Sequence, residues 1–195
     1  MAESIIDGYL INKFLFKGFD EIVTFIDKKG IRYSCISLGS KKIESKNARN
    51  LFLGSYIEFQ IFKSRFENKL SKLKKATLLK ETDWKIESDK SFIVLTNCIS
   101  RVKYTSKEFF DFYKTSIDFI SSHEYNSEAT TAIILYRFVS LNGLNENNDN
   151  IECSDDIKKN IDILHQQNYS KLNGSLATTI KCLKNFILKV LEIHV

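Results

Sequence analysis

The sequence predicts an α+β protein, in which a compact five-stranded β-barrel is followed by an all-helical C-terminal domain. Three observations predict this class. Short runs rich in β-branched and aromatic residues, separated by glycine turns, fill about the first 80 residues. From about residue 105 onward, apolar residues recur every three to four positions, as on one face of a helix. The 195 residues are 43% hydrophobic, which is enough apolar material for two small cores.

The first domain is expected at residues 1–82, and its strands follow one another closely. Asp27-Lys-Lys-Gly30 is a turn signal after the second run, and Gly39 stops the third. The fourth run alternates, with Ile57, Phe59 and Ile61 on one face. Closing such a sheet removes its exposed edges, so a barrel is favoured. The five expected strands are residues 5–16, 22–26, 31–38, 56–62 and, as a weaker candidate, 73–82.

The second domain, residues 83–195, is expected to be helical. Thr105-Ser-Lys-Glu108 is a capping box ahead of a helix that extends to Ile120. Residues 129–141 are apolar nearly all round and predict a central buried helix that ends at Gly143. A polar loop, residues 145–150, precedes a short helix capped by Ser154.

Two further segments complete the helical domain. Residues 176–191 carry the apolar stripe of a last helix. Residues 83–103 stay ambiguous, because the apolar run 92–95 fits either a strand or a turn of buried helix.

Charge is distributed unevenly along the chain, although the net charge is only +5. Residues 1–80 hold 16 lysines and arginines against 8 acidic residues, whereas residues 81–195 hold 13 against 16. A basic first half suits a polyanionic partner, and a solvated lysine-rich surface explains the count equally well. The chain has no proline and much Lys, Asn and Ile, a bias typical of an A+T-rich bacterial genome. Part of the lysine excess is therefore compositional.

Catalytic and metal-binding motifs are missing from the sequence. It has no HExxH, GxSxG or GxxxxGK[ST] motif and no CxxC pair. Cys35 lies within a strand run and is expected to be a small core residue. We therefore expect a protein that is not an enzyme and has no cofactor and no metal. The scattered candidates are Cys35, Cys98, Cys153, Cys182, His123, His165 and His194.

The cell compartment is inferred from what the sequence lacks. The N-terminal residues show no basic segment followed by an apolar run, so no secretory signal is expected. No apolar stretch reaches the roughly 20 residues that span a bilayer. We expect a cytoplasmic protein with reduced thiols and without membrane association.

The basic segment 38–49 offers the clearest chemistry in the chain. Gly39 allows a sharp turn after the third strand, so that the following lysines project from the barrel. Lysine, arginine and serine side chains bind phosphate oxygens without reading sequence. Tyr56, Phe62 and Phe66 could stack bases, although such rings are more often core. The candidate nucleic-acid-binding residues are Lys41, Lys42, Lys46, Arg49, Lys63, Arg65, Lys72, Lys74 and Lys75.

The order of these residues resembles a known family. Asp20, the strand Ile22-Val-Thr24, Gly30 and the segment Leu38-Gly-Ser-Lys-Lys-Ile-Glu-Ser45 look like the N-terminal region of the RecO recombination mediators. Gly8-Tyr-Leu10 is similar to that family's opening motif. In the second half, residues 108–120 and 132–143 look like its helical region.

The chain departs from the family pattern at several positions, as a divergent, mollicute-like member would. Gly18 stands where an acidic residue is usual, and Phe25-Ile-Asp27 replaces the end of the strand motif. The cysteine cluster that binds zinc in some members is reduced to Cys153, so no zinc is expected.

The resemblance implies a fold, a set of partners and an association with the nucleoid. It implies an OB-fold barrel, which binds single- and double-stranded DNA and anneals complementary strands, and a helical domain. It further implies that the protein helps RecA to displace single-strand-binding protein, together with RecR. The family's helical domain holds the acidic C-terminal tail of single-strand-binding protein, and Lys181, Lys184 and Lys189 beside the last apolar stripe are the candidates here. An ordinary amphipathic helix with a lysine face is the competing interpretation.

Three other functions stay open at this stage. Phosphates do not identify the sugar, so the same lysines would serve an RNA- or ribosome-binding barrel protein. An interaction scaffold would act through the helical half and would not bind nucleic acid specifically. A hydrolase would need an acidic or thiol site that the sequence does not offer.

Overall fold

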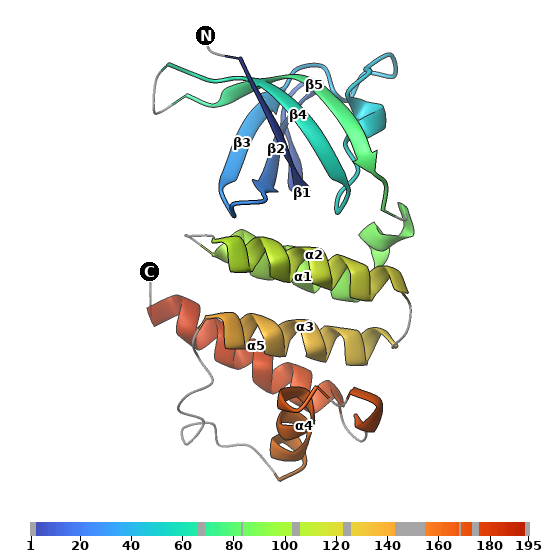
Figure 1. Cartoon of the computed structure of the whole chain (residues 1–195), viewed down its shortest axis with the longest axis vertical. Helices are drawn as coiled ribbons and strands as arrows, with labels where there is room; N and C mark the ends of the chain where they lie inside the picture. Colours follow the sequence, from blue (N-terminus) through green and yellow to red (C-terminus); the bar gives the residue numbers. More distant parts are fainter. Residues whose placement is uncertain are drawn as a thin grey trace. The chain divides into compact units, whose positions relative to one another are not determined.

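The computed structural model describes residues 3–65, 69–82, 84–102, 106–122, 126–142, 155–167, 169–172 and 176–193 (Figure 1). It divides into two compact units. One unit joins Met1–Glu87 with Val102–Lys114, and the other joins Ser88–Arg101 with Thr115–Val195.

The strands of the first unit form a closed barrel in the order β1-β2-β3-β5-β4. The β3 and β5 pair is parallel, and the other four pairs are antiparallel. This arrangement is consistent with the OB-fold, so the predicted fold class is confirmed. The strands are β1 (Glu3–Lys17), β2 (Asp20–Asp27), β3 (Arg32–Ser37), β4 (Tyr56–Phe62) and β5 (Ser71–Lys80), each close to its predicted run.

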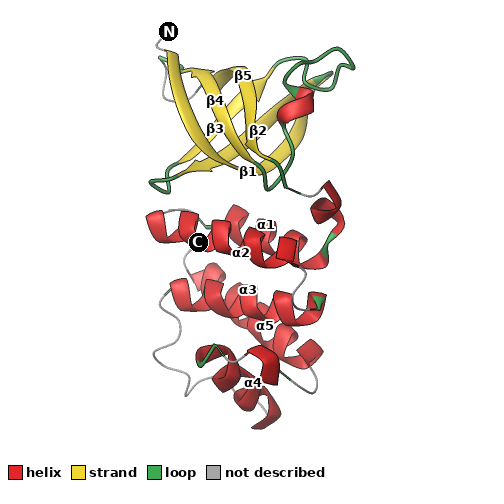
Figure 2. Ribbon diagram, turned by 45° about the vertical axis from the view of Figure 1, so that its right-hand side comes forward, coloured by secondary structure: helices red, strands yellow, loops and turns green. Residues whose placement is uncertain are grey.

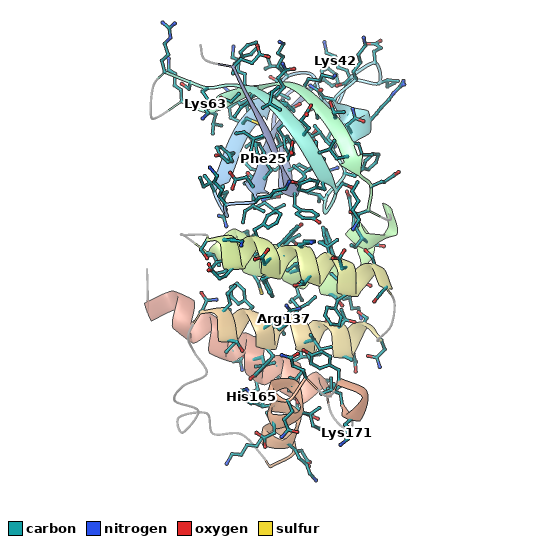
Figure 3. The ribbon with its side chains drawn as sticks, viewed as in Figure 1. Phe25, Lys42, Lys63, Arg137, His165 and Lys171 are labelled. Atoms are coloured by element: carbon teal, nitrogen blue, oxygen red, sulfur yellow. The ribbon has the colours of Figure 1, made fainter. Side chains whose placement is uncertain are left out.

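Alternation along the strands builds the barrel core. Ile57, Phe59 and Ile61 of β4 are almost fully buried, and the residues between them face outward. Phe25 lies inside the barrel (Figure 3). Its ring stacks on that of Phe59, with the centroids 3.8 Å apart. The core cluster comprises Leu10, Val23, Phe25, Cys35, Leu51, Ile57, Phe59, Ile61, Leu73 and Ala76.

Cys35 belongs to this core and not to a reactive site. Its side chain is fully buried in β3, opposite Val23 of β2. Burial disfavours the thiolate and raises the pKa of the Cys35 thiol to about 12. A thiol with so little thiolate at neutral pH is a poor nucleophile, in agreement with the prediction of a core residue.

The segment Val102–Lys114 completes the first unit. Tyr113, on the helix that begins at Lys107, is fully buried, and its hydroxyl donates to the carbonyl oxygen of Leu10 at 3.4 Å. Tyr9 packs against both Phe110 and Tyr113, with ring centroids 5.6 and 5.7 Å apart. These aromatic contacts lie across the barrel wall formed by β1 and join a distant part of the sequence to it.

The helices confirm the predicted periodicity and resolve one ambiguity. The stretch that periodicity left open contains a short 3-10 helix and then α1, in which Phe92, Leu95 and Ile99 are buried at helical spacing. The elements are η2 (Trp84–Ser88), α1 (Lys90–Arg101), α2 (Lys107–Ser122), α3 (Ser127–Leu141), α4 (Asp155–His165), η4 (Tyr169–Lys171) and α5 (Leu176–Ile193) (Figure 2).

Side-chain hydrogen bonds lie at the starts of two helices. The Asn126 side chain accepts the N–H of Ala129 at 2.8 Å and caps α3. The Ser106 hydroxyl donates to the Glu108 carboxylate, which lowers the pKa of Glu108. Thr105, Gly143, Ser154 and the loop at 145–150, which the sequence analysis singled out, lie outside the described residues.

The second unit is organised around α3, as predicted for a central helix. Ten of its fifteen residues are buried, and it contacts α1, α4 and α5. The Tyr136 hydroxyl lies 2.8 Å from His165 Nδ1 and links α3 to α4. Asn160 Nδ2 lies 3.0 Å from Thr179 Oγ1 and links α4 to α5.

Candidate nucleic-acid interface

The basic segment that follows β3 is fastened to the turn between β1 and β2. Gly39 has a φ of 62°, which favours glycine, and its N–H donates to Asp20 Oδ1 at 2.7 Å. The N–H of Lys41 donates to the carbonyl oxygen of Phe19 at 3.0 Å. The loop is therefore held at a defined place, and its lysines start from a fixed backbone.

The far end of the same loop is fastened to β5. The Asn47 side-chain oxygen accepts the N–H of Ala76 at 3.0 Å, and the Asn50 amide donates to the Ala76 carbonyl at 2.8 Å. The 3-10 helix η1 (Ala48–Asn50) begins directly after Asn47 and ends at Asn50. It is the short helix beside the barrel in Figure 2. Lys46 and Arg49, both exposed, therefore lie near the part of β5 that carries Lys72, Lys74 and Lys75.

A shallow hollow of about 620 Å³ lies where the hairpin meets the loop. Lys17 pairs with Asp20 across a two-residue turn, Gly18-Phe19, in which Gly18 has a φ of 55°. The hollow is lined by Lys17, Phe19, Asp20, Leu38, Gly39, Lys42, Glu44 and Ser45.

Sequence reasoning missed two of these lining residues, Lys17 and Phe19. The signal that could have found them is the Lys-Gly-Phe sequence between two strand runs. A glycine between strands of this kind predicts a tight hairpin, which leaves the neighbouring side chains at an exposed tip.

Two of the predicted cations are paired with carboxylates. Lys41 Nζ lies 3.2 Å from Glu21 Oε1, and the Glu21 side chain is only 6% exposed. Lys74 Nζ lies 2.8 Å from Glu3 Oε1 and 5.4 Å from the Phe62 ring centroid. These two lysines therefore contribute less net positive charge than their number suggests.

The other seven predicted cations of the barrel unit are all exposed to solvent. Within the described residues, none of the seven forms an ion pair with a carboxylate. Lys42 and Lys63 lie at the same end of the barrel but on opposite sides of it (Figure 3). The structure therefore distributes these charges over more than one side of the barrel. The seven are Lys42, Lys46, Arg49, Lys63, Arg65, Lys72 and Lys75.

A register shift in β5 explains why consecutive lysines face solvent. Gln60 pairs with Lys75, but Ile61 pairs with Leu73, so Lys74 is an extra residue on the β5 side. This bulge turns both Lys74 and Lys75 outward, where strict alternation would bury one of them. The barrel wall thus carries three exposed lysines, Lys72, Lys74 and Lys75.

The aromatic residues named as possible stacking rings have different surroundings. Tyr56 packs against Tyr9 with ring centroids 5.0 Å apart, as part of the aromatic contact with Val102–Lys114. Phe62 is half-buried on the outer face beneath Lys74. Phe66 lies outside the described residues.

Lys41→Ala is expected to destabilise the barrel unit by about 1–2 kcal/mol. It leaves the buried Glu21 carboxylate without its ion pair, and the half-exposed position of Lys41 keeps the loss below that of a fully buried pair. Lys42→Ala, in the same loop, should change stability by less than about 0.5 kcal/mol. Chemical denaturation checks both values. Adding Glu21→Gln to Lys41→Ala should recover most of the loss, and no recovery would contradict the assigned ion pair.

Three curated proteins, each named DNA repair protein RecO, are similar to this chain. The protein from Mycoplasma mycoides subsp. mycoides SC is 29% identical over 147 residues, which are 72% of this chain and 59% of that protein. The protein from Mycoplasma capricolum subsp. capricolum is 28% identical over 148 residues, with the same coverage. The protein from Mesoplasma florum is 31% identical over 111 residues, 57% of this chain and 41% of that protein.

The chain resembles these RecO proteins over most of its length, at the low identity expected of a divergent relative. No family model matches it, in keeping with that divergence. The chain spans about three fifths of the length of the two Mycoplasma relatives that it matches.

Residues that carry the RecO resemblance have structural roles in the barrel unit. The hydrogen bond from Gly39 to Asp20 joins two of the motif positions, which are 19 residues apart in sequence. Gly30 has a φ of 79° and lies against the backbone of Ser106. The family motif therefore includes residues that shape the loop, as well as lysines that project from it.

The lysines considered for a RecO partner lie on the last helix. Leu176, Leu183 and Ile187 form the buried face of α5. Lys181 and Lys184 are exposed, and the side chain of Lys189 lies outside the described part of the chain.

Among the described residues, no group of three or more His, Cys, Asp and Glu side chains is placed to hold a metal ion. The helices that the structure describes include none with the length and apolar character needed to cross a bilayer.

Proposed function

We propose that this protein acts in DNA repair as a recombination mediator that binds DNA through its basic barrel unit. The observation that carries the proposal is the loop of residues 38–50, which is fastened at both ends and presents Lys42, Lys46 and Arg49 to solvent. The names of the three similar proteins support a role in DNA repair.

The proposed mechanism uses electrostatics and no nucleotide hydrolysis. Lysines on different sides of the barrel neutralise phosphates of single- and double-stranded DNA and reduce the repulsion between two complementary strands. Strands held in this way can anneal. Because phosphate contacts carry no sequence information, the grip is independent of base sequence.

The proposal includes partners that the family resemblance implies. Acting with RecR, the protein assists loading of RecA on DNA coated with single-strand-binding protein. The acidic C-terminal tail of single-strand-binding protein binds the exposed lysines of α5, Lys181 and Lys184, together with Lys189. Opposite charge supports this contact, and the site of action is the cytoplasmic nucleoid.

Replacing Lys42, Lys46 and Arg49 together by alanine is expected to weaken binding of single-stranded DNA about 100-fold at roughly 0.1 M salt. Each lost phosphate contact removes about 0.7 from the slope of log affinity against log salt, so the slope should fall by about 2. A salt titration by fluorescence anisotropy measures both quantities. Lys41 is left in place because it neutralises Glu21.

The matched control replaces three exposed lysines of the helical unit, Lys158, Lys159 and Lys171. It removes the same charge and should leave the slope unchanged. An equal loss in both triple variants would show that net charge, and not the loop, binds the DNA. Competition with RNA of the same sequence tests an RNA-binding function, because a preference for RNA would replace the DNA proposal.

A further inference from the structure

The tip of the β1–β2 hairpin and the facing loop expose an unusual amount of apolar surface. Exposed apolar surface of this extent commonly marks a binding site. The hairpin residues Phe16 and Phe19 are 43% and 58% exposed, and Leu38 of the loop is 56% exposed. Phe14, Leu15 and Ile43 extend the exposed surface. Phosphate contacts made by lysines give no role to these exposed rings.

A bulge in β1 produces part of this exposure. Leu15 pairs with Glu21 and Lys17 pairs with Asp20, so Phe16 is an extra residue on the β1 side. Four consecutive residues, 14–17, are then exposed, where alternation would bury every second one. Bulges of this kind re-aim side chains next to binding sites.

The exposed rings of Phe16 and Phe19 each lie beside a lysine ammonium group. Lys17 Nζ is 5.5 Å from the centroid of Phe16, and Lys42 Nζ is 5.9 Å from the centroid of Phe19. Rings that alternate with cations are typical of surfaces that bind single-stranded nucleic acid, where bases stack on the rings and cations follow the backbone. A duplex cannot use such rings, because its base faces are already stacked.

The rim of the hollow also contains two carboxylates, from Asp20 and Glu44. One oxygen of Asp20 is occupied by the N–H of Gly39. Carboxylates repel a phosphate but accept hydrogen bonds from the amino groups of bases. The charges in the hollow therefore favour a base inside it, with the phosphates at Lys17 and Lys42. The Ser45 hydroxyl, which accepts the N–H of Ala48 at 3.3 Å, can donate its own proton to the ligand.

We propose that this hollow is a subsite for one unpaired nucleobase, which stacks on Phe19 while Lys17 and Lys42 hold the adjacent phosphates. The proposal rests on the proposed DNA-binding function and adds a base contact to it. The subsite gives single-stranded DNA an interaction that a duplex and a base-free strand both lack. The subsite therefore makes the protein prefer unpaired strands, without preferring any base sequence.

The test compares three probes with the same number of phosphates on the full chain: a single strand, the same strand with abasic sites, and a duplex of half its length. Phe19→Leu removes the ring from an exposed position, and Phe19→Tyr keeps it. Phe14→Leu is the matched control, since Phe14 is exposed on β1 of the same hairpin but does not line the hollow. Circular dichroism establishes that each variant is folded.

Wild type is expected to bind the intact single strand about 5- to 100-fold more tightly than the abasic strand, the range for one base–aromatic stack. Phe19→Leu should bind the intact and abasic strands with equal affinity, while Phe19→Tyr and Phe14→Leu keep the wild-type preference for the intact strand. A 2-aminopurine base in the intact strand should be quenched by wild type and less by Phe19→Leu.

Two results would overturn the subsite but leave DNA binding intact. One is equal, salt-sensitive affinity for all three probes that Phe19→Leu does not alter. The other is self-association that Phe19→Leu abolishes, without any dependence on bases, which would assign the apolar surface to a second copy of the chain. Absence of any salt-sensitive binding would overturn both the subsite and the proposed function.

Discussion

Gly30→Ala is expected to lower the free energy of unfolding of the barrel unit by about 3 kcal/mol or more. Gly30 has a φ of 79°, a conformation that costs an L-residue about 1–2 kcal/mol. A Cβ atom at this position would lie 2.0 Å from the carbonyl carbon and oxygen of Ser106 and 2.6 Å from the nitrogen of Lys107. These are backbone atoms, so the segment must move away, and overpacking of this kind costs about 1–3 kcal/mol in addition.

Gly18→Ala is the matched control for this prediction. Gly18 also has a positive φ, 55°, but nothing lies within 4 Å of a Cβ atom built on it. Gly18→Ala should therefore lower the free energy of unfolding only by the cost of the positive φ, about 1–2 kcal/mol. Urea denaturation followed by circular dichroism measures both variants. Equal losses at the two glycines would contradict the close approach of Ser106 to the barrel.

Phe25→Ala is expected to cost about 3–5 kcal/mol of stability, because it removes a fully buried ring and leaves a cavity. Phe25 stacks on Phe59 at 3.8 Å and an interplanar angle of 4°, and on Tyr33 at 5.2 Å. The three rings connect β2, β3 and β4, and Phe25 contacts both of the others, so loss of the Phe25 ring weakens contacts among three strands at once.

Two variants calibrate this effect in the same denaturation experiment. Phe25→Leu keeps most of the volume and should lose less than Phe25→Ala. Phe14→Ala removes a half-exposed ring outside the core and should lose less than about 1 kcal/mol. A thermal melt should show the same order, at about 2–4 °C for each kcal/mol. Similar losses for Phe14→Ala and Phe25→Ala would argue against a core built around the Phe25 stack.

The barrel strands could be predicted because their signals are local. Alternation from Tyr56 to Phe62 and glycine at positions 30 and 39 depend on neighbouring residues only. The helix α1 could not be assigned, because an apolar run of four residues fits two secondary structures. Its buried positions, Phe92, Leu95 and Ile99, show the helical spacing only over a longer span.

The candidate site was predicted in part. Lys42 and Lys46 could be named because a glycine and paired lysines follow a strand. The ion pair of Lys41 with Glu21 could not, because the two residues are 20 positions apart and meet only through the hairpin. Phe19 was missed because an apolar residue in a strand-rich segment is expected to be core.

The sequence by itself determined the two-part α+β organisation, the five strands, most of the helices and the basic character of the first half, since pattern and charge are properties of the chain. Only the tertiary structure decided which cations are neutralised, by Glu21 and Glu3, and which rings are left at the surface. Both depend on strand register and bulges, which bring distant side chains together or turn neighbours to the same face.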